Sequence, residues 1–172
     1  MRRLTASIMI LALVGAVAGC STMQLNIREP QAATITPSRG MGRWSTESET
    51  LPVSLNVRAR SSWRLWGKDY VYRISDIPLK PGVTVYATIR TFGPTAFTDA
   101  AQVPVVINDQ DIQDVVRGNV VRIVVVDPKR EYQTSQFESL RLSPTDDVVK
   151  RAEEIGSLLV LVTLGNRDPL AK

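Results

Sequence analysis

The chain has 172 residues, 44% of them hydrophobic and 22% charged, with 21 basic and 17 acidic side chains. It contains no histidine and a single cysteine. The lack of histidine removes the commonest general base and the usual partner of a nucleophilic serine or cysteine. One cysteine cannot form an internal disulfide, a CxxC redox pair or a thiolate zinc site. We therefore expect no enzyme, no cofactor and no metal centre.

The first twenty residues have the layout of an export signal. Arg2 and Arg3 precede an apolar run from Ile8 to Ala18, which ends in small residues. A run of about eleven residues is too short for the roughly 20 that a membrane-spanning helix needs. The pattern predicts that residues 1–19 are a signal peptide.

The sequence Val17-Ala18-Gly19-Cys20 resembles the lipobox of bacterial lipoproteins. The resemblance implies that the Cys20 thiol carries a diacylglycerol and that its amine, freed by cleavage, receives a further acyl chain such as palmitate. Two or three chains hold a protein on a membrane where a single chain does not. Ser21, in place of an aspartate, is similar to the pattern that sorts such proteins to the outer membrane, facing the periplasm.

Residues 20–50 are rich in Ser, Thr, Gly, Gln and Pro and show no sustained apolar period. This composition predicts that the lipidated cysteine is followed by a flexible tether, with a reach of about 30 Å for 30 residues. Residues 51–172 are then expected to form a single β-rich globular domain.

Apolar residues alternate with polar ones from Leu51 onward, which is typical of strands with one buried face. The turn sequence Lys80-Pro81-Gly82-Val83 predicts a type II turn between two paired strands. Pro104 cannot donate to a sheet ladder and predicts an edge strand or a bulge. The strands predicted in this way cover residues 51–59, 69–76, 84–92 and 102–107.

Two short helices are predicted from their end signals. The first has Asn108 or Asp109 as its cap and Gly118 just past its end. The second is bounded by Ser143 as its cap and by Gly156.

The segments 119–127 and 157–164 are apolar on both faces and are predicted as central strands. Because the second helix separates them, we expect a parallel or mixed pairing with a crossover. The intervening residues 128–142 are predicted as a polar connection. The fold class is therefore α+β, mainly β, with a small β-sandwich-like domain and two short helices.

The stretch from Arg58 to Arg73 interleaves basic and aromatic side chains. If exposed, flat rings beside cations bind sugar rings or partner side chains. If buried, the same rings cover one end of the core. The candidate ligand or partner face consists of Trp63, Arg64, Trp66, Tyr70 and Tyr72.

A group of oxygen-bearing side chains marks the start of the first helix. A hard cation prefers such ligands, but the spacing does not fit an EF-hand loop. A capped acidic first turn explains the same residues and is the preferred interpretation. The residues concerned are Asn108, Asp109, Asp111 and Asp114.

Three further charged residues are candidate functional groups. Glu131 and Glu138 are a conceivable acid and base pair for glycoside hydrolysis, although no spacing selects them over solvated loop charges. Arg122 lies inside an apolar strand and needs a partner or an exit to solvent. We expect a structural ion pair or an edge-facing side chain at Arg122, with a ligand contact as the alternative.

Together these features predict a membrane-anchored envelope lipoprotein whose non-catalytic domain binds a protein partner or assists assembly of an envelope complex. The alternative is a carbohydrate- or peptidoglycan-binding module that uses residues 58–73. A small carboxylate-dependent hydrolase is a third hypothesis.

Half of the formal charge of +4 comes from Arg2 and Arg3. The remainder is too small to indicate a nucleic-acid partner.

Overall fold

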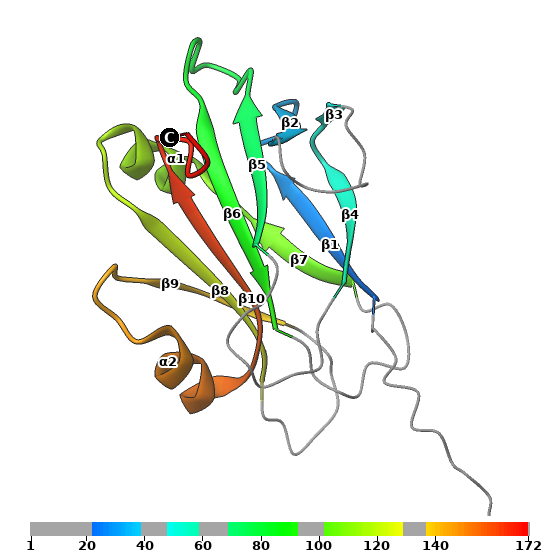
Figure 1. The fold of residues 1–172 in the computed structure, drawn as a ribbon, viewed down its shortest axis with the longest axis vertical. Helices are drawn as coiled ribbons and strands as arrows, with labels where there is room; N and C mark the ends of the chain where they lie inside the picture. The colour runs from blue at the N-terminus through cyan, green and yellow to red at the C-terminus, as the bar shows by residue number, and fades with distance from the viewer. Residues whose placement is uncertain (1–21, 39–47, 59–68, 93–101, 129–136, 172) are drawn as a thin grey trace, which may run out of the picture.

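The computed structural model describes residues 22–38, 48–58, 69–92, 102–128 and 137–171. Within these ranges the chain forms two packed β-sheets and two short helices, which confirms the predicted mainly β fold class (Figure 1). The predicted signal peptide and Cys20 lie outside the described residues. No helix in the described ranges is long and apolar enough to cross a membrane.

The larger sheet has seven strands, and every neighbouring pair in it is antiparallel. In spatial order the strands are β3 (Glu49–Thr50), β2 (Thr34–Pro37), β5 (Asp69–Ser75), β6 (Val85–Thr91), β10 (Gly156–Gly165), β8 (Val121–Pro128) and β9 (Glu138–Leu142).

The smaller sheet has three strands, in the order β4 (Val53–Arg58), β1 (Thr22–Glu29) and β7 (Gln102–Val106). The central strand β1 is antiparallel to β4 and parallel to β7. In Figure 1 these strands lie at the right, while helices α1 (Asp109–Val116) and α2 (Val148–Ile155) lie at the left.

The main core fills the space between the two sheets, since alternate residues of each strand point inward. In β6, for example, Val85, Ala87 and Ile89 are buried and the residues between them are partly exposed. A second, smaller cluster forms where α2 packs through Ala152 against the other face of the large sheet. Strand β8 therefore contributes to both clusters, which explains its nearly continuous apolar sequence.

The predicted tether is wrong for most of residues 20–50, because β1, β2 and β3 belong to the fold. Met23, Leu25 and Ile27 of β1 are buried at alternate positions within a mostly polar segment. Neighbouring strands on both sides satisfy the backbone of β1, so three apolar side chains are enough to hold it. The folded domain thus includes β1, β2 and β3, which precede residue 51.

The predicted parallel or mixed pairing of the two central strands is also wrong, because β8 and β10 are antiparallel neighbours. The residues predicted as a polar connection contain β9, which pairs with β8. The helical crossover therefore joins β9 to β10, and these two strands run in the same direction on either side of β8.

Several local predictions are confirmed. Val83 donates its backbone N–H to the Lys80 carbonyl at 3.2 Å, and Gly82 has a φ of +75° in the turn between β5 and β6. Asn108 caps α1, and β7, which contains Pro104, is an edge strand.

The second helix begins later than predicted. Ser143 opens a turn in which its backbone N–H donates to the Asp146 carboxylate at 2.9 Å. The cap is Asp147, whose carboxylate accepts from the backbone N–H groups of Val149 and Lys150. Two consecutive capping signals occur in this segment, and the second of them starts the helix. The predicted end at Gly156 is confirmed.

Candidate functional site

The aromatic residues of the predicted ligand face that the structure describes are buried. Tyr70 is 4% exposed and Tyr72 is 6% exposed, and both belong to the main core. Burial, with smaller contributions from Tyr70 and Glu49, raises the pKa of Tyr72 from 10.0 to about 12. These two rings therefore do not present a face to a ligand. Trp63, Arg64 and Trp66 lie outside the described residues.

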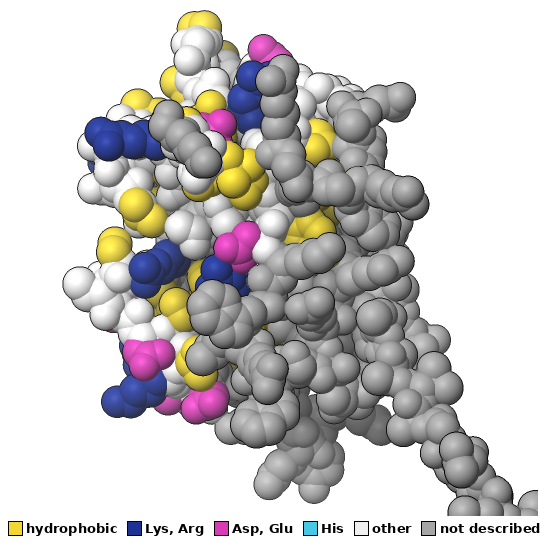
Figure 2. Space-filling view, viewed as in Figure 1, with side chains coloured by type: hydrophobic (Ala, Val, Ile, Leu, Met, Phe, Trp, Pro, Cys, Tyr) yellow, Lys and Arg dark blue, Asp and Glu magenta, His cyan; other side chains and the backbone are white. Residues whose placement is uncertain are grey.

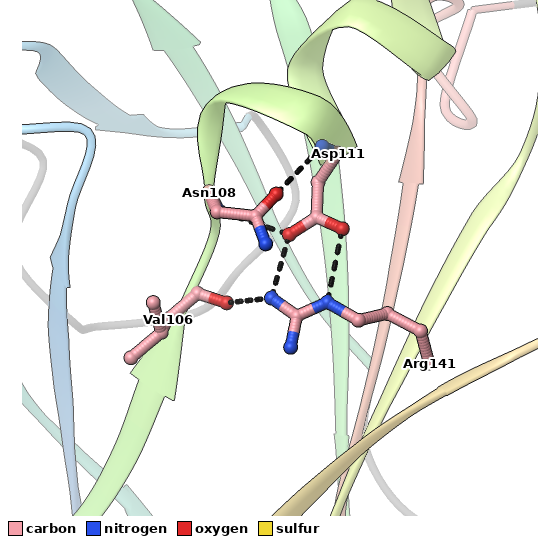
Figure 3. Close-up of polar contacts among 4 residues, drawn as sticks. All are labelled: Val106, Asn108, Asp111 and Arg141. Carbon is pink, nitrogen blue, oxygen red and sulfur yellow. Dashed lines mark hydrogen bonds and ion pairs between the residues drawn. The ribbon is translucent and has the colours of Figure 1, made fainter.

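The polar residues at the start of α1 form a capping box (Figure 3). The Asn108 side chain accepts the Asp111 backbone N–H at 2.8 Å, and the Asp111 carboxylate accepts the Asn108 backbone N–H at 2.8 Å. Asp109 pairs instead with Lys80, and Asp114 with Arg117. Over the part of the chain that the structure describes, no acidic or cysteine group has the arrangement of a metal site.

Asp111 also forms a two-point ion pair with Arg141 of β9 (Figure 3). Arg141 Nε and Nη2 donate to the two Asp111 oxygens at 3.1 and 2.8 Å, and Nη2 also donates to the Val106 carbonyl at 3.2 Å. The hydrogen bond to Asp111 raises the pKa of Arg141. The cluster joins α1, β7 and β9, so it links both sheets and its role is structural.

The structure does not provide a distance between the two glutamates suggested as a hydrolytic pair. Glu138 is exposed at the first position of β9, and Glu131 lies outside the described residues.

A different group of residues meets on the face of the large sheet that points away from the small sheet. Thr163 of β10 pairs in register with Thr88 of β6 on one side and with Arg122 of β8 on the other. Arg90 and Leu161 form the adjacent row. Cross-strand partners project to the same face of a sheet, so these five side chains lie together.

These side chains form the floor of a cavity of about 320 Å³, which we call the Arg122 hollow. The start of α2 and the residue after β6 complete its wall. The described lining residues are Thr88, Arg90, Phe92, Arg122, Val148, Val149, Leu161 and Thr163.

The two arginines of the Arg122 hollow differ in their partners. Arg90 donates Nε and Nη2 to the two Asp69 oxygens at 2.6 and 2.7 Å, and this pairing raises the Arg90 pKa. Arg122 is half-buried, and across the described ranges it has no ion pair or side-chain hydrogen bond. The predicted ion pair at Arg122 is thus not found among the described residues, and β8 lies between β10 and β9 rather than at a sheet edge. The ligand contact stays a hypothesis.

A second cavity of about 430 Å³ lies on the same face, between β2, β6 and the C-terminal residues. Its described lining includes one cation, Arg73, and one anion, Asp168. These opposite charges leave the second cavity without a net charge, so it has less electrostatic preference for a ligand than the Arg122 hollow has.

In the view of Figure 2, basic, acidic and hydrophobic side chains are interspersed over the described surface, and neither sign of charge dominates. The described side chains visible in this view therefore form no broad surface of one charge. The described lining of the Arg122 hollow has hydroxyl, guanidinium and apolar groups.

The sequence identified Arg122 as unusual but did not identify Thr88 and Thr163. Their role depends on the register of three strands, which no local pattern in the sequence specifies. Comparison of the chain with family models, with curated proteins and with solved structures finds no match.

Proposed function

We propose that this protein is an exported lipoprotein of the bacterial envelope, anchored by acyl chains on Cys20. Its β-rich domain binds an envelope partner and performs no catalysis. The observation that carries the proposal is the motif Val17-Ala18-Gly19-Cys20, which follows a short apolar run and contains the only sulfhydryl group of the chain. By resemblance to lipoprotein sorting, Ser21 favours the outer membrane, facing the periplasm.

The position of β1 indicates that only a short peptide separates the lipidated Cys20 from the folded domain. Thr22 is the first residue of β1, and two residue steps from Cys20 span at most about 7 Å. Arg58 of β4 pairs with Thr22, and Gln102 of β7 pairs with Gln24, so both neighbouring strands also have an end near the start of β1. Acyl chains on Cys20 would hold that end of the sandwich beside the headgroups, in place of the 30 Å tether expected from composition.

The binding role rests on the unpaired cation in the described lining of the Arg122 hollow. The alternative of a glycan-binding face is weakened, because Tyr70 and Tyr72 are core residues. The remaining sequence argument for glycan binding is the presence of Trp63 and Trp66.

Cys20→Ala tests the anchor. We expect membrane fractionation to move the variant from the membrane to the soluble envelope fraction, because the variant has no thiol to modify. Intact mass of the wild-type protein should show loss of residues 1–19 and added acyl mass. Ser21→Ala, which keeps the thiol, is the matched control and should remain in the membrane fraction. A Cys20→Ala protein that stays as firmly membrane-bound as wild type would overturn the proposal.

A further inference from the structure

We propose that the Arg122 hollow binds a monocarboxylate that carries a compact apolar group. This inference deepens the proposed binding role and rests on it, but it is independent of the anchor at Cys20. It is argued from the pairing of the arginines, the charge of the cavity and the nature of its wall.

The first argument is the contrast between three arginines of the large sheet. Arg90 and Arg141 each form a two-point pair with a carboxylate, Asp69 and Asp111 respectively. Arg122 is half-buried between apolar neighbours and has no such partner in the part of the chain that is described. A planar guanidinium matches a carboxylate in two parallel hydrogen bonds. A ligand carboxylate would give Arg122 the two-point pairing that Asp69 gives Arg90 and Asp111 gives Arg141.

The second argument is the charge of the cavity. Asp69 compensates Arg90, so Arg122 leaves one positive charge in the described lining. Thr163 lies beside Arg122 in register, Thr88 lies beside Thr163 on the next strand, and both add neutral hydroxyl donors. One cation with two hydroxyls suits a single negative charge better than a phosphate dianion, which cationic clusters usually bind.

The third argument is the apolar character of one wall of the cavity. Val149 is 38% exposed, and together with Val148, Leu161 and Phe92 it gives the cavity an apolar side. A ligand that covers these side chains removes apolar surface from water, which stabilises the complex. The volume of about 320 Å³ is at the lower end of the roughly 300–1,000 Å³ typical of small-molecule sites. The ligand group that enters is therefore small, of the size of one amino acid.

A carboxylate beside one apolar side chain occurs both in a small free acid and in the last residue of a peptide. The Arg122 hollow recognises the chemistry that these two sources share, so probes of each kind are needed to separate them.

The test uses the full chain, purified in mild detergent in a buffer without carboxylates, and follows binding by NMR chemical-shift titration. N-acetyl-L-leucine is the probe, and N-acetyl-L-leucine amide is the neutral control. We expect the acid to bind with a dissociation constant on the order of 1 mM. We expect the amide, which is uncharged and offers Arg122 a single acceptor oxygen, to bind at least about 10-fold more weakly.

Arg122→Gln should weaken binding of the acid by at least about 10-fold, whereas Arg73→Gln, outside the Arg122 hollow, should leave it unchanged. Equal affinities for acid and amide, no binding of the acid at 20-fold the expected dissociation constant, or full binding by Arg122→Gln would each overturn the inference. If Arg122→Gln does not fold, Thr163→Val and the acid–amide comparison on the wild-type protein still decide it.

A tripeptide that ends in leucine separates the two sources. Tighter binding of its free-acid form than of N-acetyl-L-leucine would indicate a peptide C-terminus, and weaker binding would indicate a small free acid. Failure of all probes together with release of the Cys20→Ala protein from the membrane would reject the Arg122 hollow and leave the proposed anchor standing.

Discussion

The ion pair between Arg141 and Asp111 should contribute measurably to stability, and Arg141→Met tests this. Methionine keeps much of the length of the side chain but provides no donor. The Asp111 carboxylate then loses two charge-assisted hydrogen bonds and keeps the one from the Asn108 backbone. The Val106 carbonyl loses its side-chain donor as well.

The expected loss follows from the burial of the two partners. Removing one partner of a fully buried ion pair costs about 3–5 kcal/mol. The Asp111 side chain is 6% exposed, but the Arg141 side chain is 38% exposed, so water replaces part of what is lost. We therefore expect Arg141→Met to lower the free energy of unfolding by about 2–3 kcal/mol.

The assay is urea unfolding of the full chain in a double-mutant cycle with Asp111→Asn. Because the two side chains contact each other, the double variant should lose at least about 1 kcal/mol less than the sum of the single losses. Arg151→Met is the control, since it breaks the exposed pair with Glu154 and should cost at most about 0.5 kcal/mol. Additive losses, or equal losses for the Arg141 and Arg151 variants, would refute the reasoning.

Two further predictions concern the core and a close backbone contact. Because its pKa is raised from 10.0 to about 12, Tyr72 contributes stability that is complete below about pH 10 and is lost as the pH rises toward 12. Urea unfolding from pH 8 to 12 should show a loss of about 2–3 kcal/mol in the wild-type protein that Tyr72→Phe lacks, and parallel pH profiles would contradict the assignment. Gly156→Ala would place a Cβ against the backbone of Asp127 and Pro128 and should destabilise the protein by about 1–3 kcal/mol. Gly165→Ala, which meets open space, serves as its control in thermal unfolding, and equal melting temperatures of the two variants would argue against the close contact.

The elements that could be predicted from the sequence are those with local signals. Alternation placed β5 and β6, the Pro81-Gly82 pair placed the turn between them, and Asn108 with Gly118 bounded α1. Each of these signals depends on neighbours only a few residues apart along the chain.

The elements that were missed depend on contacts between distant residues. Strand β1 has a short local signal, because Met23, Leu25 and Ile27 are buried at alternate positions. Three apolar residues in a mostly polar segment do not distinguish a strand from a tether without the pairing to β4 and β7. Strand β9 has only two apolar residues in alternation, Leu140 and Leu142, and it is held by pairing with β8.

The Arg122 hollow likewise exists only because three strands align Thr88, Thr163 and Arg122. The sequence alone therefore indicates that Arg122 is unusual, but it does not predict the cavity.

The place of β1 in the middle of the small sheet has a consequence for folding kinetics. Leu25 pairs with Leu55 on one side and with Val103, from the second half of the chain, on the other. Such non-local pairing gives a high contact order and slow folding. Until β7 has been synthesised and docked, one side of β1 exposes unpaired backbone groups and apolar side chains, which invites aggregation. We therefore expect refolding of the full chain to be slow and to lose more protein to aggregates as its concentration rises.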